Sequence, residues 1–304
     1  MLKHTLLISM LLAGLGAQVR GVTIDTVPVG NPGNATNAGA GAVGYDYRIG
    51  STEVTNSQYA EFLNAKAASD PLALFNTGMG SDARGGITQS GISGSYTYAV
   101  KTDMSNKPVN FVNWYDCVRF ANWLHNGQGT GDTETGSYTL LGGTPSPTNW
   151  PSISRSTGAT WVLAGYDEWQ KAGYYDPTLN SGAGDYWRFP TRSNTVPTMA
   201  TASGIGDISN PGSNVVNYGG GADWNGQNGN VTSVGGAGPL SKSFYGTSDQ
   251  GGNVSEWADT VFPSPITNTP GIYVLGGAWG EGHSSSLEQF TAFITGPTSF
   301  ESGG

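Results

Sequence analysis

The sequence contains a single cysteine, Cys117, among 304 residues. A single cysteine cannot form an intramolecular disulfide, and a metal site built only from cysteines is equally excluded. Histidine is scarce as well, because beyond residue 21 only His125 and His283 occur, far apart in sequence. A zinc site of the His/Cys type is therefore not expected.

Long hydrophobic runs are missing beyond the N-terminus. There, Lys3 precedes an apolar run from Thr5 to Ala17, and small residues follow it. A charged start and a short apolar stretch are typical of a secretory signal peptide, which we predict over residues 1–21. Cleavage after Ala17 is one option, and cleavage after Gly21 is preferred. The alternative is an N-terminal membrane anchor, but the run is shorter than the ~20 residues of a membrane span.

Charged residues make up only 12% of the chain, and basic residues are the scarcer kind. Without residues 1–21, which include Lys3 and Arg20, 11 basic residues stand against 22 acidic ones. This acidic balance disfavours nucleic acids and anionic membranes as partners. We expect a protein that is secreted or located in the cell envelope, and that is not an integral membrane protein after signal cleavage.

Glycine and aromatic residues are abundant, with 48 Gly, 9 Trp, 14 Tyr and 10 Phe. Glycine and proline interrupt nearly every apolar run, so long helices are not expected. The aromatic residues can supply a large core, which argues against disorder. We predict one domain over residues 45–304, with short helices, short strands and long loops, preceded by a flexible segment over 22–44.

Three segments have the pattern of an extended run followed by a helix. In residues 45–67, Thr55 and Gln58 have the spacing of a capping box. In residues 107–127, an extended run over 109–112 leads to Asn113 as the predicted N-cap, with Asp116 three residues on. The third segment, residues 161–177, predicts a strand and then a short helix. The apolar face of the second helix contains Cys117, Phe120, Ala121 and Leu124, which places the thiol in the core.

Patterns of known catalytic machinery are not found. The sequence has no G-x-S-x-G nucleophile motif, no phosphate-binding loop and no dinucleotide fingerprint. A carboxylate pair for glycoside hydrolysis stays an alternative among the 22 acids, but no spacing singles out a pair. We therefore predict no catalytic residues.

The stretch "DQGGNVSE", residues 249–256, favours cation binding. Asp249 and Glu256 offer carboxylates, and the glycines between them let backbone carbonyls turn toward an ion. If residues 252–256 are extended, Gly252, Val254 and Glu256 lie on one side. Asn253 then points to the other side, where it can hydrogen-bond a neighbouring loop. The alternative is an Asx-type turn with an exposed glutamate.

Five stretches, in this order, resemble the formylglycine-generating enzyme (sulfatase-modifying factor) domain family between about Tyr45 and about Gly282. They are "EVTNSQYAEFLNA", "KPVNFVNWYDCVRFANWL", "WVLAGYDEWQKA", "YGTSDQGGNVSEW" and "VLGGAWG". The resemblance implies a single α+β domain with a C-type-lectin-like fold. "VTIDTVPVGNPGNA" is similar to the exported bacterial branch. Because the chain stops at "FESGG", we expect neither a C-terminal sorting anchor nor the closing Gly-Phe-Arg-Val strand that is usual in the family.

The resemblance also implies metal sites. It assigns a structural calcium ion to Asp249, Gly252, Val254 and Glu256, with the two middle residues acting through their carbonyls. A second family calcium site lies upstream, in "NVVNYGGGADWNGQNGNV". The candidate ligands there are Asn217 and Asn230.

Copper is not expected, because the resemblance points to missing ligands. Oxidising members hold copper with two cysteines, whose positions fall near Glu281 and Ser286 in this chain. Neither is cysteine, and Cys117 lies on a different element. Cuprous ion needs soft thiolate ligands, so the oxidase chemistry is not expected.

We therefore expect a secreted, non-catalytic, calcium-stabilised binding or cell-envelope-associated module, although a fold alone does not fix function. Its partner would be a glycan or another surface protein. One alternative is a formylglycine-generating-type oxidase or sulfatase activator. The other is a hypervariable lectin-fold receptor protein that is diversified over residues 279–300.

Overall fold

The computed structural model describes residues 21–263 and 270–300. The predicted signal peptide therefore lies outside the described residues, apart from Gly21. The helices are α1 (Asn56–Lys66), α2 (Gly78–Ser81), α3 (Trp114–His125), α4 (Tyr166–Tyr174) and α5 (Leu179–Gly182). The first strands are β1 (Thr26–Val29), β2 (Tyr47–Gly50), β3 (Ile87–Ser90), β4 (Thr97–Val100), β5 (Tyr175–Asp176) and β6 (Asp185–Tyr186). The later strands are β7 (Thr198–Met199), β8 (Val215–Val216), β9 (Glu256–Pro263), β10 (Pro270–Leu275) and β11 (Ala292–Thr295).

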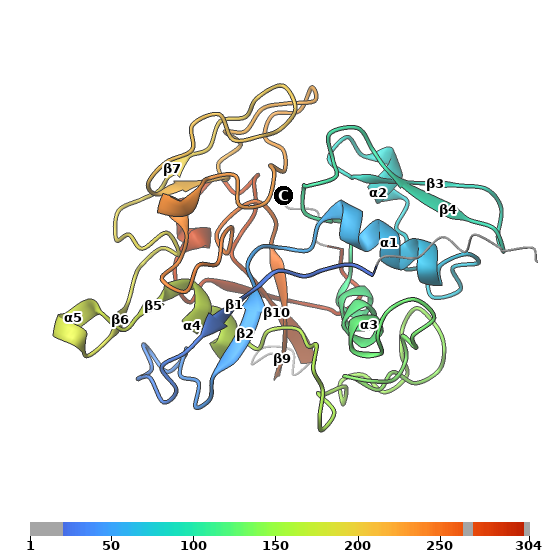
Figure 1. Cartoon of the computed structure of the whole chain (residues 1–304), viewed down its shortest axis with the longest axis horizontal. Coiled ribbons are helices and arrows are strands. Elements are labelled where there is room, and N and C mark those ends of the chain that lie inside the picture. Colours follow the sequence, from blue (N-terminus) through green and yellow to red (C-terminus); the bar gives the residue numbers. More distant parts are fainter. Residues whose placement is uncertain (1–20, 264–269, 301–304) are drawn as a thin grey trace, which may run out of the picture.

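The strands form several small sheets rather than one large one. The three-stranded antiparallel sheet has the order β11-β10-β9, and the other sheets are the pairs β1-β2, β3-β4, β5-β6 and β7-β8. In Figure 1, α1 and α3 lie to the right of β9 and β10, while α4 lies to their left. β11 is an edge strand beside β10, whereas we did not expect a closing strand after residue 282. The predicted α+β class with short elements and long loops is confirmed.

Both predicted capping boxes are present. The Gln58 N–H donates to the Thr55 side chain, and the Thr55 N–H donates to Gln58 Oε1 at 2.8 Å. Asn113 and Asp116 make the same reciprocal pair at the start of α3. These bonds satisfy N–H groups that a helix start leaves unpaired, which fixes where α1 and α3 begin. On the α3 face, Cys117 packs against the core cluster that contains Phe120 and Leu124, but it is only partly buried and so lies at the edge of the core.

Two predicted extended segments join no sheet. In residues 109–112, Phe111 has a φ of 58°, which breaks an extended run. Residues 161–164 are held mainly by side chains, because the Leu163 N–H donates to the Tyr138 hydroxyl and the Leu163 carbonyl accepts from Arg155. Conversely, β1 lies inside the segment 22–44 that we expected to be flexible, and its pairing with β2 ties that segment to the domain.

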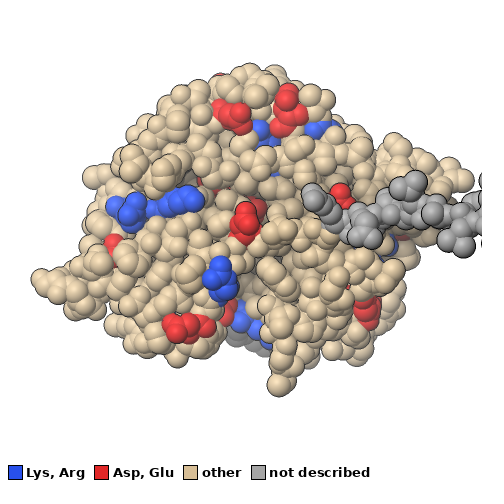
Figure 2. Space-filling view, viewed as in Figure 1, with Lys and Arg blue, Asp and Glu red and all other residues tan. Residues whose placement is uncertain are grey.

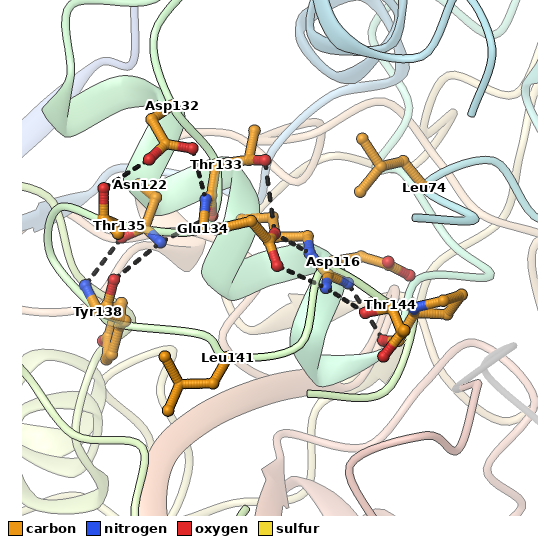
Figure 3. A network of polar contacts seen from close by, with 12 residues as sticks. Leu74, Asp116, Asn122, Asp132, Thr133, Glu134, Thr135, Tyr138, Leu141 and Thr144 are labelled. Atoms are coloured by element: carbon orange, nitrogen blue, oxygen red, sulfur yellow. Dashed lines mark hydrogen bonds and ion pairs between the residues drawn. The ribbon is translucent and has the colours of Figure 1, made fainter. Parts of the chain in front are cut away.

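The polar loop over residues 127–160 is fastened to α3 by two buried side chains. The fully buried Arg119 pairs with Glu134, Nε to Oε1 at 2.6 Å, and donates to the Thr144 carbonyl at 2.7 Å. Asn122 donates to the Tyr138 carbonyl at 3.1 Å and accepts from the Tyr138 N–H at 2.8 Å. Figure 3 shows this network between the helix and the loop. The loop therefore needs no regular secondary structure to be fixed in place.

Helix α3 has core on more than one side. Phe120, Trp123 and Leu124 pack with α1 residues such as Phe62, while Trp114 belongs to a second cluster that includes Ile272 of β10.

None of the described helices has the length and apolar character that a membrane span requires. Charged side chains are sparse and scattered on the face drawn in Figure 2, which shows no basic patch.

Candidate functional site

The predicted cation segment is a tight curl that leads into β9. Asp249, Gly252 and Asn253 all have positive φ, at 60°, 80° and 62°. Residues 252–254 are therefore not extended, and the alternation we predicted does not apply before Glu256. A side chain at position 252 is excluded, because a Cβ atom would lie 2.2 Å from the Asn217 carbonyl oxygen. The glycine allows both the backbone turn and the close approach.

Asn253 is the centre of this curl, and it is 1% exposed. Its Oδ1 accepts from the Thr232 N–H at 2.8 Å and from Asn217 Nδ2 at 3.1 Å. Its Nδ2 donates to Glu53 Oε1 at 3.0 Å. One side chain thus joins the segment before α1, the loop between β8 and β9, and the curl itself. This agrees with the neighbouring-loop role that the sequence suggested for Asn253.

Three carboxyl groups lie around the curl, and each accepts a hydrogen bond from a neutral donor. Glu256 Oε2 accepts from Trp169 Nε1 at 2.7 Å, and Asp249 Oδ2 accepts from the Gly235 N–H at 2.5 Å. Glu53 Oε2 is buried without a hydrogen-bond partner among the described residues. No described ion pair includes any of these acids.

The acids influence one another through their charges. Burial raises the pKa of Asp249 to about 6, and burial together with the nearby Asp249 charge raises the pKa of Glu256 to about 7. For Glu53, burial and then the charges of Asp249 and Glu256 raise the pKa well above its usual range. The fold thus brings the two predicted acids together and adds a third that the sequence did not single out.

Backbone oxygens are also free at this site. The carbonyls of Gly252 and Val254 accept no hydrogen bond from any residue that the structure describes. The acids alone do not make a metal cluster, since the described part of the chain holds no group of three or more His, Cys, Asp or Glu side chains arranged for an ion. A hard cation here would therefore need the carbonyls as well as the carboxylates, and oxygen donors of both kinds suit calcium.

The second predicted pair is also brought together. Asn217 Nδ2 donates to the Asn230 carbonyl at 2.9 Å, and both residues are buried. Asn217 Oδ1 is buried with no partner among the described residues. Asn230 Oδ1 already accepts from the Val231 N–H at 2.8 Å. Of this pair, Asn217 is the one with a free side-chain oxygen.

Comparison with known proteins now identifies the family. The model of the sulfatase-modifying factor enzyme 1-like domain matches residues 26–299. The chain belongs to this family. Among solved structures, CarF superposes with a TM-score of 0.56 and 18% identity, covering 92% of this chain and 96% of that one. Treponema denticola variable protein 1 gives a TM-score of 0.51 and 17% identity, covering 94% of each chain. A search of curated proteins found no match.

Glu281 and Ser286, near which the resemblance would place the copper-binding cysteines of oxidising members, have no thiol. Glu281 is partly exposed, and Ser286 is buried with its hydroxyl donating to the His283 carbonyl at 2.8 Å. Cys117 is on α3, in the wall of a cavity that is partly open to solvent and that Glu281 and Ser286 do not line. Burial raises the pKa of the Cys117 thiol above its usual range, which disfavours the thiolate.

Glu53 is the site residue that sequence analysis missed. It lies two residues before the N-cap Thr55, in the stretch "EVTNSQ" that we used for helix capping and for the family resemblance but not for the ion site. Its hydrogen bond with the buried Asn253, about two hundred residues away in the sequence, brings Glu53 into the site. The one available signal was an acid in a family motif that helix capping did not require.

Proposed function

We propose that this protein is a secreted, non-catalytic member of the sulfatase-modifying factor family that acts as a calcium-stabilised binding or cell-envelope-associated module. The observation that supports this most directly is the chain's lone cysteine. The family cysteines would fall near Glu281 and Ser286, which are not cysteines, and the lone Cys117 is on α3, so no pair of thiols within this chain can hold cuprous ion. The partner would be a glycan or another surface protein.

The donor set at the curl supports the calcium part of this proposal. Asp249 and Glu256 would supply carboxylates, and Gly252 and Val254 would supply free carbonyls. Glu53 offers a further carboxyl oxygen without a partner. A bound cation would relieve the cost of placing several acids together in a partly buried setting. Asn217 Oδ1 is the available donor for a second ion.

The calcium proposal is tested by thermal unfolding of the mature domain with and without calcium. Extracellular modules bind calcium with dissociation constants of about 0.1 to 1 mM. At about ten times that constant, an ion that binds only the folded state adds about 1.4 kcal/mol. We expect calcium to raise the melting temperature, and Glu256→Gln to remove most of that rise.

Glu61→Gln is the matched control, because Glu61 is an exposed acid on α1. It should leave the calcium response intact. If chelation leaves the wild-type melting temperature unchanged and Glu256→Gln has no effect, the curl is an ordinary turn. The enzyme alternative is tested separately by incubation with copper and a Cys-containing sulfatase peptide. Any formylglycine formed would contradict the non-catalytic assignment.

A second candidate is a lectin-fold receptor protein with a variable surface. It is favoured by the likeness in fold to a protein named variable protein 1, although 17% identity speaks for the fold alone. Residues 279–300 are the proposed variable region, and Phe293 and Ile294 within it are 50% and 42% exposed. Sequencing this gene from several isolates decides the matter, since the candidate requires variation clustered in those codons.

A further inference from the structure

A cavity of about 270 Å³ that is partly open to solvent lies next to the curl, between α1, α3 and the start of β9. Its size is substantial, because an apolar protein cavity of roughly 150 Å³ is enough to bind benzene. Several apolar side chains that line it, including Trp161, Leu163 and Trp257, are only partly buried because they face this space. The cavity therefore has room for a small organic molecule.

The cavity wall is mainly apolar, and its only acidic or basic side chains are two glutamates. Phe120 and Ala121 of α3 and Trp161 contribute to the apolar part. Glu53 and Glu256 line the wall as well, and no Lys, Arg or His side chain lies among the lining residues. Such a wall repels anions and leaves acidic charge without a basic partner.

Charge balance points to a positively charged occupant. None of the three carboxyl groups has a basic partner among the described ion pairs, and burial disfavours their ionised forms unless a positive charge lies close by. If calcium binds as proposed above, its two charges match only two of the carboxylates of Glu53, Asp249 and Glu256, and a further cation could match the third. Aromatic faces on the wall add to the preference, because Trp rings attract ammonium groups through the ring quadrupole. The Trp161, Trp169 and Trp257 side chains all line the cavity.

We propose that this cavity binds a small organic monocation, an ammonium group attached to an apolar body. The ammonium group lies at the end of the cavity formed by Glu53 and Glu256, and the apolar body packs against the aromatic and aliphatic wall. The inference rests on the binding role proposed above, but it does not depend on the calcium ion. It names a class of small-molecule ligand for a cavity separate from residues 279–300.

Binding is measured by calorimetry with benzylamine, benzyl alcohol and benzoate, which share a ring and differ in charge. We expect benzylamine to bind at least about tenfold more tightly than benzyl alcohol, and benzoate to bind most weakly. Equal binding of the amine and the alcohol would overturn the proposal. Each titration is run in calcium and in calcium-free buffer. An amine preference in both, with no thermal effect of calcium, would reject the calcium site and keep the cavity site.

Glu53→Gln removes the charge and keeps an oxygen that can accept from Asn253, so the curl should stay in place. We expect it to reduce the preference for the amine to within about twofold of the alcohol, with Glu61→Gln as the unchanged control. An undiminished preference in Glu53→Gln would overturn the assignment. Ala121→Leu should weaken binding of amine and alcohol alike, because the added side chain fills the cavity.

Cys117 provides a second measurement, since its side chain lines the same cavity. Saturating benzylamine should slow the reaction of Cys117 with a small neutral thiol reagent at least about threefold in the wild type. The same concentration should have little effect in Ala121→Leu. If benzylamine binds without slowing the wild-type reaction, it binds elsewhere on the protein, and the proposal is wrong.

Discussion

Strand β9 meets two groups of acids that are stabilised in different ways. Near its middle, Asp259 and Glu168 of α4 share one arginine, Arg155, whose guanidinium donates to both carboxylates. At its start, Glu256 lies with Asp249 and Glu53, and no described ion pair includes these three. The pKa of Glu168 is lowered despite its burial, because Arg155 and the Gly165 N–H bind the ionised form. The pKa of Glu256 is raised to about 7.

The first group of acids is neutralised by an arginine of the protein itself, whereas the second group has no basic side chain paired with it. Arg155 also donates to the Leu163 carbonyl at 2.6 Å, and Tyr45 donates to Glu168 at 2.7 Å, so the first group joins several loops by itself. The second group has hydrogen bonds but no cation of its own. We infer that the first group stabilises the fold unaided, whereas the second gains stability from an added ion.

The largest expected effect comes from breaking the arginine-paired group. Arg155→Ala leaves Glu168 and Asp259 largely buried without their partner, and removing one member of a buried pair costs about 3 kcal/mol or more. The loss should be the same with and without calcium, measured by urea unfolding. Arg192→Ala, at an exposed arginine, is the control and should cost little. A calcium-dependent loss in Arg155→Ala would mean that the two groups are coupled.

Asn253→Ala should give the next largest effect. It removes the amide that bonds Glu53, Thr232 and Asn217, and leaves buried groups unsatisfied at about 1 to 3 kcal/mol. Alanine also fits poorly at a φ of 62°. Asn253→Gly lacks the same amide but accepts that φ, so it should be less harmful than alanine. Both losses should appear in calcium-free buffer during thermal unfolding; a loss seen only with calcium would reassign Asn253 to the ion site.

Local rules predicted the helix starts, because a capping box is written within four consecutive residues. Thr55 with Gln58 and Asn113 with Asp116 both behave as their spacing indicates. The family resemblance supplied the fold and the residues of the curl. The predicted conformation of the curl was wrong. We expected an extended segment with alternating side chains, but Gly252 and Asn253 adopt positive φ.

Long-range partners could not be predicted in this way. Glu53 joins the site only through Asn253, and Cys117 is half-buried because the cavity lies beside α3. The segment 161–164 has the composition of a strand, yet its polar groups bond to the side chains of Tyr138 and Arg155. In each case the deciding contact is distant in sequence, and no periodicity within a short window reports it.

The smallest expected effect is a difference in pH dependence that sharpens the contrast between the two groups. Glu256 has a folded-state pKa of about 7, above its ordinary value of 4.5. A raised pKa stabilises the fold below the ordinary value, and that stability is lost as pH rises through the folded value. In calcium-free buffer, the stability of wild type relative to Glu256→Gln should therefore fall between about pH 4.5 and pH 7. The change should be on the order of 1 kcal/mol after screening.

With saturating calcium the sign should reverse, because the ion binds the ionised carboxylate and its contribution grows as Glu256 loses its proton. Glu168 provides the opposite reference. Its lowered pKa means that the stability it contributes is present at neutral pH and is lost as pH falls through that lowered value, with or without calcium. Urea unfolding of wild type, Glu256→Gln and Glu168→Gln across this range measures all three trends. If the wild type and Glu256→Gln stay parallel in both buffers, Glu256 is a solvated turn residue and the contrast drawn here fails.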